Sequence, residues 1–360
     1  CKVTNLFVIA RNSSFAYKGK PVNVQQVGRE LGVRYVLEGS VQKAGDRVRI
    51  TAQLIDTTTG YHLWSDNYDR DLSDIFALQD EITLKIIETM QIKLTMGEQA
   101  RLWEGVTQNI QAYDKFMRGV DCINRNNEKD NKQAQHFLKE AISIDKKFSF
   151  AHTMLGMSYI LDLLYRWSKS PLESFEQAEL SAENALALND SLDMAHILIG
   201  WIYLLKRQHK EAIKEGERAV ELNPNGAFVY SHLALFLCFS DKTELAIKLL
   251  KRAFRLNPIP SPSNYIFLAI AYRVDGQYEK AIEVAEKGLK DNPDQLSPYL
   301  ALASSYSLLN RDEDARKAAK QVLRIDPNFS LDYLSKTLPY KNQETLNEYV
   351  EALRKAGLPD

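Results

Sequence analysis

The residues of this sequence whose type could support chemistry near neutral pH are its histidines. His152 and His196 occupy the same position in two successive helical repeats, and His232 lies close to that position. Because an imidazole titrates near neutrality and can bind a metal, such a series could sense pH or hold a metal ion. The alternative is that these are partly buried helix residues with satisfied hydrogen bonds. His152 and His196 are therefore the candidate sensor residues.

The signatures of known catalytic sites are absent from the sequence. It contains no HExxH, CxxC or GxSxG pattern, and Gly19-Lys20 is followed by Pro21 and lacks the upstream glycine spacing of a phosphate-binding loop. Its three cysteines are too few and too scattered for a disulfide framework or a metal site. We therefore predict that this chain is not an enzyme and holds no cofactor and no metal.

The elements that position the histidines follow a repeat in the sequence. Prolines recur 34, 35 and 34 residues apart, at Pro224, Pro258, Pro293 and Pro327. A small residue recurs in step with them, at Gly200, Ala234, Ala269 and Ala303. A small residue lets two helix axes approach closely, and a proline ends the second helix of a hairpin because it cannot continue one. A period of about 34 residues predicts tetratricopeptide-type helical hairpins.

The repeat extends beyond these four copies in degraded form. Gly156 fits the same template if about ten residues are inserted between the two helices, and Gly119 fits a first copy. We predict about six hairpins over residues 111–330 and a capping helix within residues 331–360. The insertion contains Tyr165-Arg166-Trp167, which we expect to pack against its own repeat rather than to stack on a bound ring.

The first helix of each hairpin faces the concave side of a tetratricopeptide superhelix. By register, that groove is lined by Phe116, Phe150, Met157, Met194, Ile197, Trp201, Phe228, Leu235, Phe239, Ile266 and Ile270, with Arg273 nearly alone as a cation. A clamp for a peptide carboxylate needs several cationic or amide side chains, so the lining favours an amphipathic helix or an extended apolar peptide instead. The alternative is a groove that packs on the amino-terminal domain, or that is narrow and filled by its own side chains.

Residues 1–97 have a different pattern and precede a predicted linker at 98–110. Strand-like segments lie at Leu6–Ala10, Val33–Gln42, Val48–Leu54 and Tyr61–Trp64, and helical segments at Val24–Leu31 and Ser73–Leu94. This order predicts helices on a mostly antiparallel sheet. The predicted fold class is therefore a two-part α+β chain, with a small α/β sheet domain followed by an all-α tetratricopeptide superhelix.

Several segments of this first part carry a resemblance to a known family. They are Val8–Gly19, Glu30–Val41, Arg49–Asp56, Leu63–Arg70 and Asp74–Ile82. Together with the repeats they resemble the TolB amino-terminal-like domain fused to tetratricopeptide repeats, found in bacterial proteins downstream of class III adenylate/guanylate cyclase domains and of winged-helix regulators. Leu353–Pro359 is similar to the tail of such cyclases. The family's domain begins with one further strand and helix that this sequence lacks.

The resemblance implies the sensory or regulatory half of a signalling protein. In several members a membrane span separates this half from the effector and places it in the periplasm, so the resemblance favours the periplasm where the residues alone leave periplasm and cytoplasm open. Because the chain opens with Cys1 and almost directly on a strand-like run, we expect a fragment of a longer protein.

Charge and hydropathy limit the class of partner. The 360 residues carry 46 Lys and Arg against 47 Asp and Glu, a formal net charge of -1. Nucleic-acid binding relies on clustered cationic charge, and a membrane span needs roughly 20 apolar residues in a row, so neither partner is expected. The predicted partner is a protein or peptide, with a second copy of the chain as one candidate.

These observations predict a non-catalytic regulatory module whose groove binds an apolar peptide or protein and signals to a separate effector. One alternative is a small-molecule or pH sensor with its ligand between the two parts or near His152 and His196. Another is the C-terminal part of an adenylate or guanylate cyclase whose catalytic domain is absent from this sequence.

Overall fold

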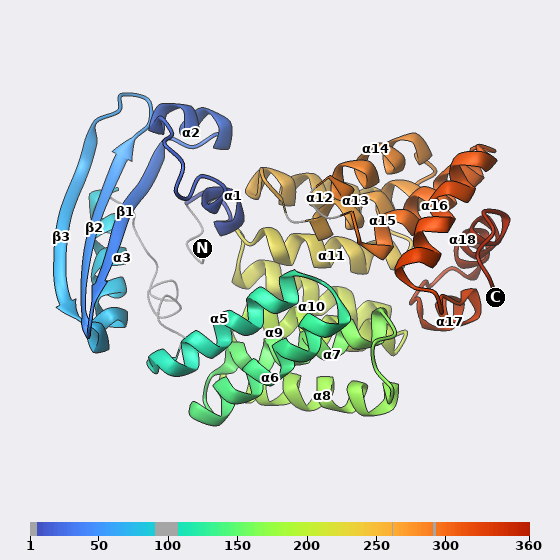
Figure 1. Ribbon diagram of the computed structural model, residues 1–360, viewed down its shortest axis with the longest axis horizontal. Coiled ribbons are helices and arrows are strands. Elements are labelled where there is room, and N and C mark those ends of the chain that lie inside the picture. The colour runs from blue at the N-terminus through green and yellow to red at the C-terminus, as the bar shows by residue number, and fades with distance from the viewer. Residues whose placement is uncertain (1–5, 91–106, 261, 291–292) are drawn as a thin grey trace.

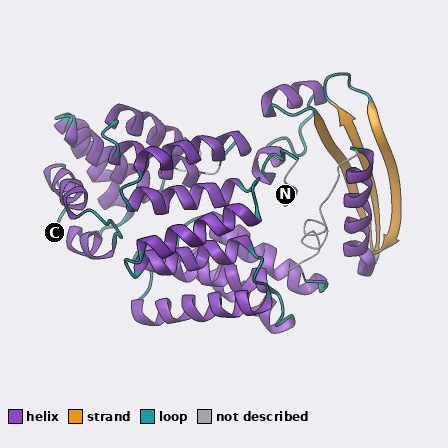
Figure 2. Cartoon of the chain, turned by 180° about the vertical axis from the view of Figure 1, so that it is seen from behind, coloured by secondary structure: helices purple, strands orange, loops and turns teal. Residues whose placement is uncertain are grey.

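The sheet and the helical repeats occupy separate parts of the molecule. The computed structural model describes residues 6–90, 107–260, 262–290 and 293–360, and Figure 1 shows the strands beside a long helical array. Seen from behind in Figure 2, the strands are confined to one end. The predicted fold class, a small sheet part followed by a long helical region of tetratricopeptide type, is confirmed.

Three antiparallel strands form the sheet within the described residues, in the order β1-β2-β3. They are β1 (Tyr35–Ala44), β2 (Arg47–Asp56) and β3 (His62–Asp71). A short 3-10 helix, η1 (Leu72–Asp74), leads into α3 (Ile75–Thr89), and α2 (Val24–Leu31) precedes the sheet. Side chains alternate between the two faces of a strand. Ala52 and Tyr68 therefore face Leu78 of α3 and form a small core.

The strand predicted at Leu6–Ala10 is wrong. Residues 6–10 form no strand, and α1 (Arg11–Phe15) follows them. The backbone N–H of Ala10 donates to the carbonyl of Leu256 at 2.8 Å, so this segment bonds to the helical array instead of to the sheet. The helix predicted to end at Leu94 ends at Thr89 in α3. Its predicted last residues, like the boundary at residue 97, lie outside the described residues.

Within the described residues, twelve helices pair into six hairpins. They are α5 (Ile110–Asn124), α6 (Glu128–Ile144), α7 (Ser149–Leu164), α8 (Pro171–Leu188), α9 (Asp193–Leu205), α10 (His209–Leu222), α11 (Ala227–Phe239), α12 (Thr243–Leu256), α13 (Pro262–Val274), α14 (Tyr278–Leu289), α15 (Leu296–Leu308) and α16 (Asp312–Ile325). A Cβ added at Gly200 would clash with the ring of Phe236, and one at Gly156 would clash with Leu198. The small residues of the repeat thus mark close helix contacts, as predicted.

Each hairpin turns on one residue in the left-handed conformation. In chain order these residues are Asn126, Arg166, Arg207, Asp241, Gly276 and Asn310. The array also curls back on itself, because the hydroxyl of Tyr165, after α7, lies 3.5 Å from that of Ser297 in α15. The second and sixth hairpins therefore meet.

Two helices follow the last hairpin, α17 (Leu331–Thr337) and α18 (Gln343–Lys355). The side chain of Asn342 caps α18, and Gly357 with φ 99° follows it. Leu346 and Leu353 of α18 are buried in the main core. Helix α18 corresponds to the predicted capping helix, whereas α17 was not predicted, because its seven residues are too few to show a helical period.

Candidate binding surfaces of the helical array

Three large apolar side chains lie at the second residue of successive first helices. They are Phe150 of α7, Met194 of α9 and Phe228 of α11. Phe150 and Met194 are half-buried, and Phe228 is 37% exposed. Aligned apolar groups that stay partly exposed mark a surface for association. We call these three residues the apolar row.

Most other residues predicted to line the groove lie in the core. Met157, Ile197, Trp201, Leu235, Phe239 and Ile266 are at most 8% exposed. Phe116 and Ile270 are half-buried against the core. A groove that binds a partner through these positions and a groove filled by its own side chains both stay predictions.

A segment of the chain crosses the array after the sixth hairpin. Residues 326–341, which we call the C-terminal strap, include α17. The hydroxyl of Tyr333 donates to the carbonyl of Leu163 near the end of α7, at 3.1 Å. The backbone N–H of Lys341 donates to the carbonyl of Phe239 at the end of α11, at 2.9 Å. The strap therefore runs past the ends of the first helices.

Arg166 and Arg207 hold the strap from the turns of the second and third hairpins. Arg166 donates to the carbonyl of Asn328 at 3.0 Å, and Arg207 donates to those of Lys336 and Tyr340, both at 3.2 Å. Both arginines have positive φ, a conformation that Asn and Gly adopt more readily. The other four turns have Asn, Asp or Gly there. Arginine at these two turns is thus a signal of the strap that lies in the sequence but outside the 34-residue period.

Arg273, predicted as the single cation of the groove, is buried beneath the strap. It is 4% exposed and donates a hydrogen bond to the hydroxyl of Tyr340. Its guanidinium carbon lies 3.9 Å from the ring centre of Tyr349 in α18, a geometry in which the ring face stabilises the cation. The ring of Tyr340 also packs edge-on against Phe239, with ring centres 4.8 Å apart. Arg273 is therefore engaged by phenols of the same chain.

The candidate sensor histidines make equivalent contacts in successive hairpins. Nε2 of His152 lies 3.2 Å from the carbonyl of Lys146, and Nε2 of His196 lies 2.9 Å from that of Asp190. Nδ1 of His196 also lies 2.6 Å from a carboxylate oxygen of Glu215. Burial lowers the pKa of His196, but the bonds to Glu215 and to the Asp190 carbonyl outweigh burial and leave that pKa above the ordinary 6.5. The structure does not bring His152 and His196 into one site.

His232 is the histidine with the largest pKa change. Its Nδ1 lies 2.9 Å from the carbonyl of Phe228, and aromatic rings of Trp201, Phe228 and Phe267 surround it. A carbonyl only accepts hydrogen bonds, so Nδ1 carries the proton of the neutral ring. Burial lowers the pKa of His232 to about 4.

The segment before the sheet is anchored on the array. We call residues 6–15 the N-terminal arm. Ser13 in it is fully buried, donates to the side-chain oxygen of Asn257 at 2.6 Å and accepts from the backbone N–H of Ile259 at 2.7 Å. The side chain of Asn225, in the loop before α11, donates to the carbonyl of Leu6 at 2.6 Å. An extended apolar run has the same pattern in a strand and in an arm, so the contact could not be predicted from residues 6–10 alone.

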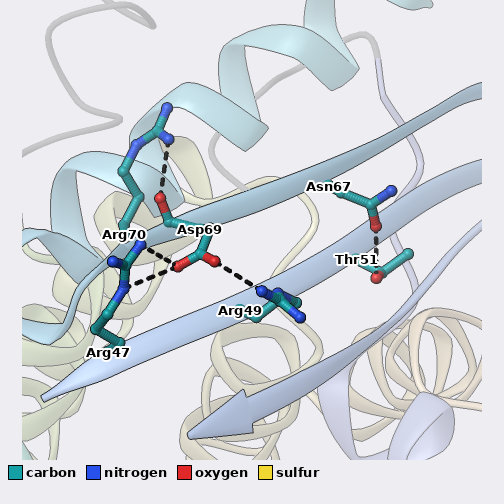
Figure 3. Close-up of polar contacts among 6 residues, drawn as sticks. All are labelled: Arg47, Arg49, Thr51, Asn67, Asp69 and Arg70. Carbon is teal, nitrogen blue, oxygen red and sulfur yellow. Dashed lines mark hydrogen bonds and ion pairs between the residues drawn. The ribbon is translucent and has the colours of Figure 1, made fainter. Parts of the chain in front are cut away.

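The sheet face opposite α3 is polar. Figure 3 shows Asp69 of β3 between Arg47 and Arg49 of β2, with hydrogen bonds of 2.7 Å and 2.9 Å. These two bonds lower the pKa of Asp69. Thr51 donates to Asn67 one row further along the strands, at 2.7 Å. Such side chains are typical of the solvated face of an antiparallel sheet.

The described part of the chain contains neither a membrane-spanning helix nor a metal-binding group. None of its helices is both long and apolar enough to span a membrane. Nor does that part bring three or more His, Cys, Asp or Glu side chains together in a metal-binding group.

The helical region is of the tetratricopeptide type. Residues 172–227 and 272–335 match family models described as tetratricopeptide repeat. The protein named "Putative adenylate cyclase 3" of Rhizobium meliloti (strain 1021) is 42% identical over 211 residues, which are 59% of this chain and 36% of that protein. The TPR repeat-containing protein YpiA of Bacillus subtilis (strain 168) is 26% identical over 149 residues, 41% of this chain and 34% of that protein.

The chain spans about a third of the length of these two relatives. These matches support the assignment of tetratricopeptide repeats to the helical region, and they show similarity to a protein named as a putative adenylate cyclase. The predicted resemblance to the TolB amino-terminal-like domain and to winged-helix regulators stays a prediction.

Solved structures are similar at low identity. The Pseudomonas aeruginosa pilF structure has a TM-score of 0.41 at 18% identity, covering 62% of this chain and 95% of that one. The Cut9 and Hcn1 hetero-tetramer of the APC/C gives a TM-score of 0.48 at 17% identity, covering 72% of this chain and 52% of that one. At these values neither structure informs the function of this chain.

Proposed function

We propose that this chain is the non-catalytic regulatory part of a signalling protein, and that its array binds a protein or peptide partner through the apolar row. The observation that carries the proposal is the 37% exposure of Phe228, at the same hairpin position as the half-buried Phe150 and Met194. A partner that covers these side chains gains affinity from apolar burial. An amphipathic helix or an extended apolar peptide fits a surface of this kind.

The apolar row lies close to the anchor of the N-terminal arm. Phe228 follows Asn225 by three residues, and Asn225 bonds to the carbonyl of Leu6 in the arm. A partner on the row would therefore act on the loop that holds the arm, and through the arm on the sheet. This supports a regulatory role over a purely structural one.

The effector that we propose is an adenylate or guanylate cyclase domain. The name of the Rhizobium meliloti relative supports it, and the chain spans only about a third of that relative. Cyclase activity would then belong to a separate domain. We place the module in the periplasm, as the family resemblance implies.

The proposal is tested on a peptide selected from a display library against the full chain. Phe228→Glu puts a charge where the partner's apolar side chains would pack, so we expect at least about tenfold weaker binding of that peptide by calorimetry. Met194→Glu should act in the same direction. The control is Leu172→Glu on α8, where the side chain is 70% exposed and lies outside the apolar row.

The outcome is decisive if the variants fold, which thermal melts would check. Unchanged affinity of both apolar-row variants would remove this surface from the proposal. Equal weakening by Leu172→Glu would show a general effect of added charge.

A further inference from the structure

A pocket opens between the second helices of the first two hairpins, and no residue of the apolar row lines it. Its volume is about 480 Å³. Lys139 and Ile142 of α6, Lys146 after it, His152 of α7, and Asn184 and Leu188 of α8 line it. The lining thus combines two cations, a titratable ring and an amide with apolar side chains.

The next hairpin shows what the ring at this position binds. His196 is the equivalent of His152, and it holds the carboxylate of Glu215 on Nδ1 and a backbone carbonyl on Nε2. Ala185 of α8 and Ala219 of α10 occupy the same position of the repeat. Four residues before them lie Ser181 and Glu215, so Ser181 takes the place of Glu215 in this hairpin. The hydroxyl of Ser181 bonds back to the carbonyl of Gln177 at 2.7 Å, so it does not replace the carboxylate.

Hydrogen-bond chemistry fixes how His152 could bind a ligand. Its Nε2 lies 3.2 Å from the carbonyl of Lys146, which only accepts, so Nε2 carries a proton. The free nitrogen is then Nδ1, which accepts a hydrogen bond when the ring is neutral and donates one when the ring is protonated. A carboxylate bound at Nδ1 therefore requires the protonated ring.

The charges around the pocket favour an anion. Among the residues that the structure describes, Lys139 and Lys146 form no ion pair with a carboxylate, and the ammonium of Lys139 lies 5.6 Å from the ring centre of Tyr159. α6 and α8 end beside the pocket, and helix C-termini repel anions, so the lysines have to supply the attraction. α8 contributes Asn184 and no ionisable side chain to the lining, so Lys139, Lys146 and His152 are its titratable groups.

We propose that this pocket binds a small organic carboxylate, with its head group on protonated His152, Lys139 and Lys146 and its apolar part on Ile142 and Leu188. This site is separate from the apolar row and goes beyond the proposed function. A carboxylate on Nδ1 requires the protonated ring, so binding takes up a proton on His152 and affinity rises as the pH falls.

The test uses sodium hexanoate as the ligand and the uncharged hexanamide as its isostere, on the full chain labelled at isoleucine methyl groups. We expect hexanoate to shift the methyl signal of Ile142 at about pH 5.5, with at least about tenfold weaker binding at about pH 8. Hexanamide should leave the signal in place. Equal shifts by both compounds, or equal hexanoate affinity at both pH values, would overturn the proposal without any variant.

Two variants locate the interaction. His152→Gln keeps a donor for the Lys146 carbonyl and should remove the pH dependence of hexanoate binding, and Lys139→Gln should weaken binding by about threefold or more at the lower pH. His196→Gln, at the equivalent position of the next hairpin, should change neither result. If His152→Gln binds hexanoate with the pH dependence of the wild type, the site is not the one that we infer.

Discussion

Two histidines of the array respond to acid in opposite directions. The folded-state pKa of His196 lies above 6.5, so its contribution to stability is full below that pH and is lost as the pH rises through the folded pKa. The folded-state pKa of His232 is about 4, so its contribution is present above 6.5 and is lost as the pH falls toward 4. The contributions of His196 and His232, which lie in neighbouring hairpins, to the pH dependence of stability therefore oppose each other.

The larger of these effects can be measured at His232. The gap between its folded pKa of about 4 and the ordinary 6.5 predicts that the free energy of unfolding falls by roughly 2 to 3 kcal/mol between about pH 7.5 and pH 4.5. His232→Gln should be less stable at neutral pH, because it leaves part of the aromatic pocket empty, and should lose less on acidification. Urea midpoints at the two pH values measure both effects.

His136→Gln is the control for this prediction, because His136 is 65% exposed on α6. It should follow the pH dependence of the wild type. If His232→Gln is as acid-sensitive as the wild type, then other groups control the acid response of the array.

At the scale of elements, the C-terminal strap depends on a buried cation. Tyr340→Phe removes the hydroxyl that accepts a hydrogen bond from Arg273. The guanidinium of Arg273 is buried, so water cannot readily replace that acceptor. An unsatisfied buried donor of this kind costs roughly 1 to 3 kcal/mol. We expect the free energy of unfolding to fall by that amount in urea titrations.

Tyr333→Phe is the matched control within the same strap. The hydroxyl of Tyr333 donates to the Leu163 carbonyl, but this tyrosine is half-buried, so water can replace the bond. We expect a loss of about 0.5 to 1 kcal/mol. A Tyr340→Phe variant no less stable than Tyr333→Phe would mean that Arg273 does not need the strap.

The N-terminal arm is a second segment anchored on the array, and the buried Ser13 makes two of its hydrogen bonds. Ser13→Ala leaves the side chain of Asn257 and the N–H of Ile259 without the hydroxyl that joins them, at a cost of roughly 2 kcal/mol. The arm should open more often, and the amide of Ala10 should exchange with solvent at least about tenfold faster. Ser14→Ala, which removes an exposed bond to the Arg11 carbonyl, should leave exchange unchanged. Comparable exchange in the two variants would contradict the anchoring role of Ser13.

At the scale of the whole molecule, the period of the sequence predicted the array but not its closure. Pro224, Pro258 and Pro293 recur about every 34 residues because each hairpin packs on the next one along the chain. Such contacts between neighbouring hairpins leave a regular pattern in the sequence. The strap joins Asn328 to Arg166, 162 residues away in the sequence. Long-range contacts of this kind do not recur along the sequence and leave no period, so α17 and its arginine partners could not be predicted in this way.

The need for long-range packing also explains why only some of the residues predicted to line the groove remain partly exposed. Register placed Phe150, Met194 and Phe228 correctly on the first helices, because side-chain direction follows from helical geometry. Burial of Trp201 and Arg273 depends on how tightly the hairpins pack and on what the strap covers. Neither property is encoded at those positions alone. His152 was found by its residue type, but its pocket is formed by residues of α6, α7 and α8 together, an arrangement that the residue type does not show.

The C-terminal strap also has a consequence for how such a protein can change in evolution. Open solenoids gain and lose repeats freely, because each unit contacts only its neighbours. Here Arg166, Arg207 and Arg273 donate hydrogen bonds to particular residues of the C-terminal strap. The second and sixth hairpins are also in contact. Duplication or deletion of an internal hairpin would move these three arginines out of step with the segment that they bind. The copy number of the repeats is therefore locked by a part of the chain that is not itself a repeat.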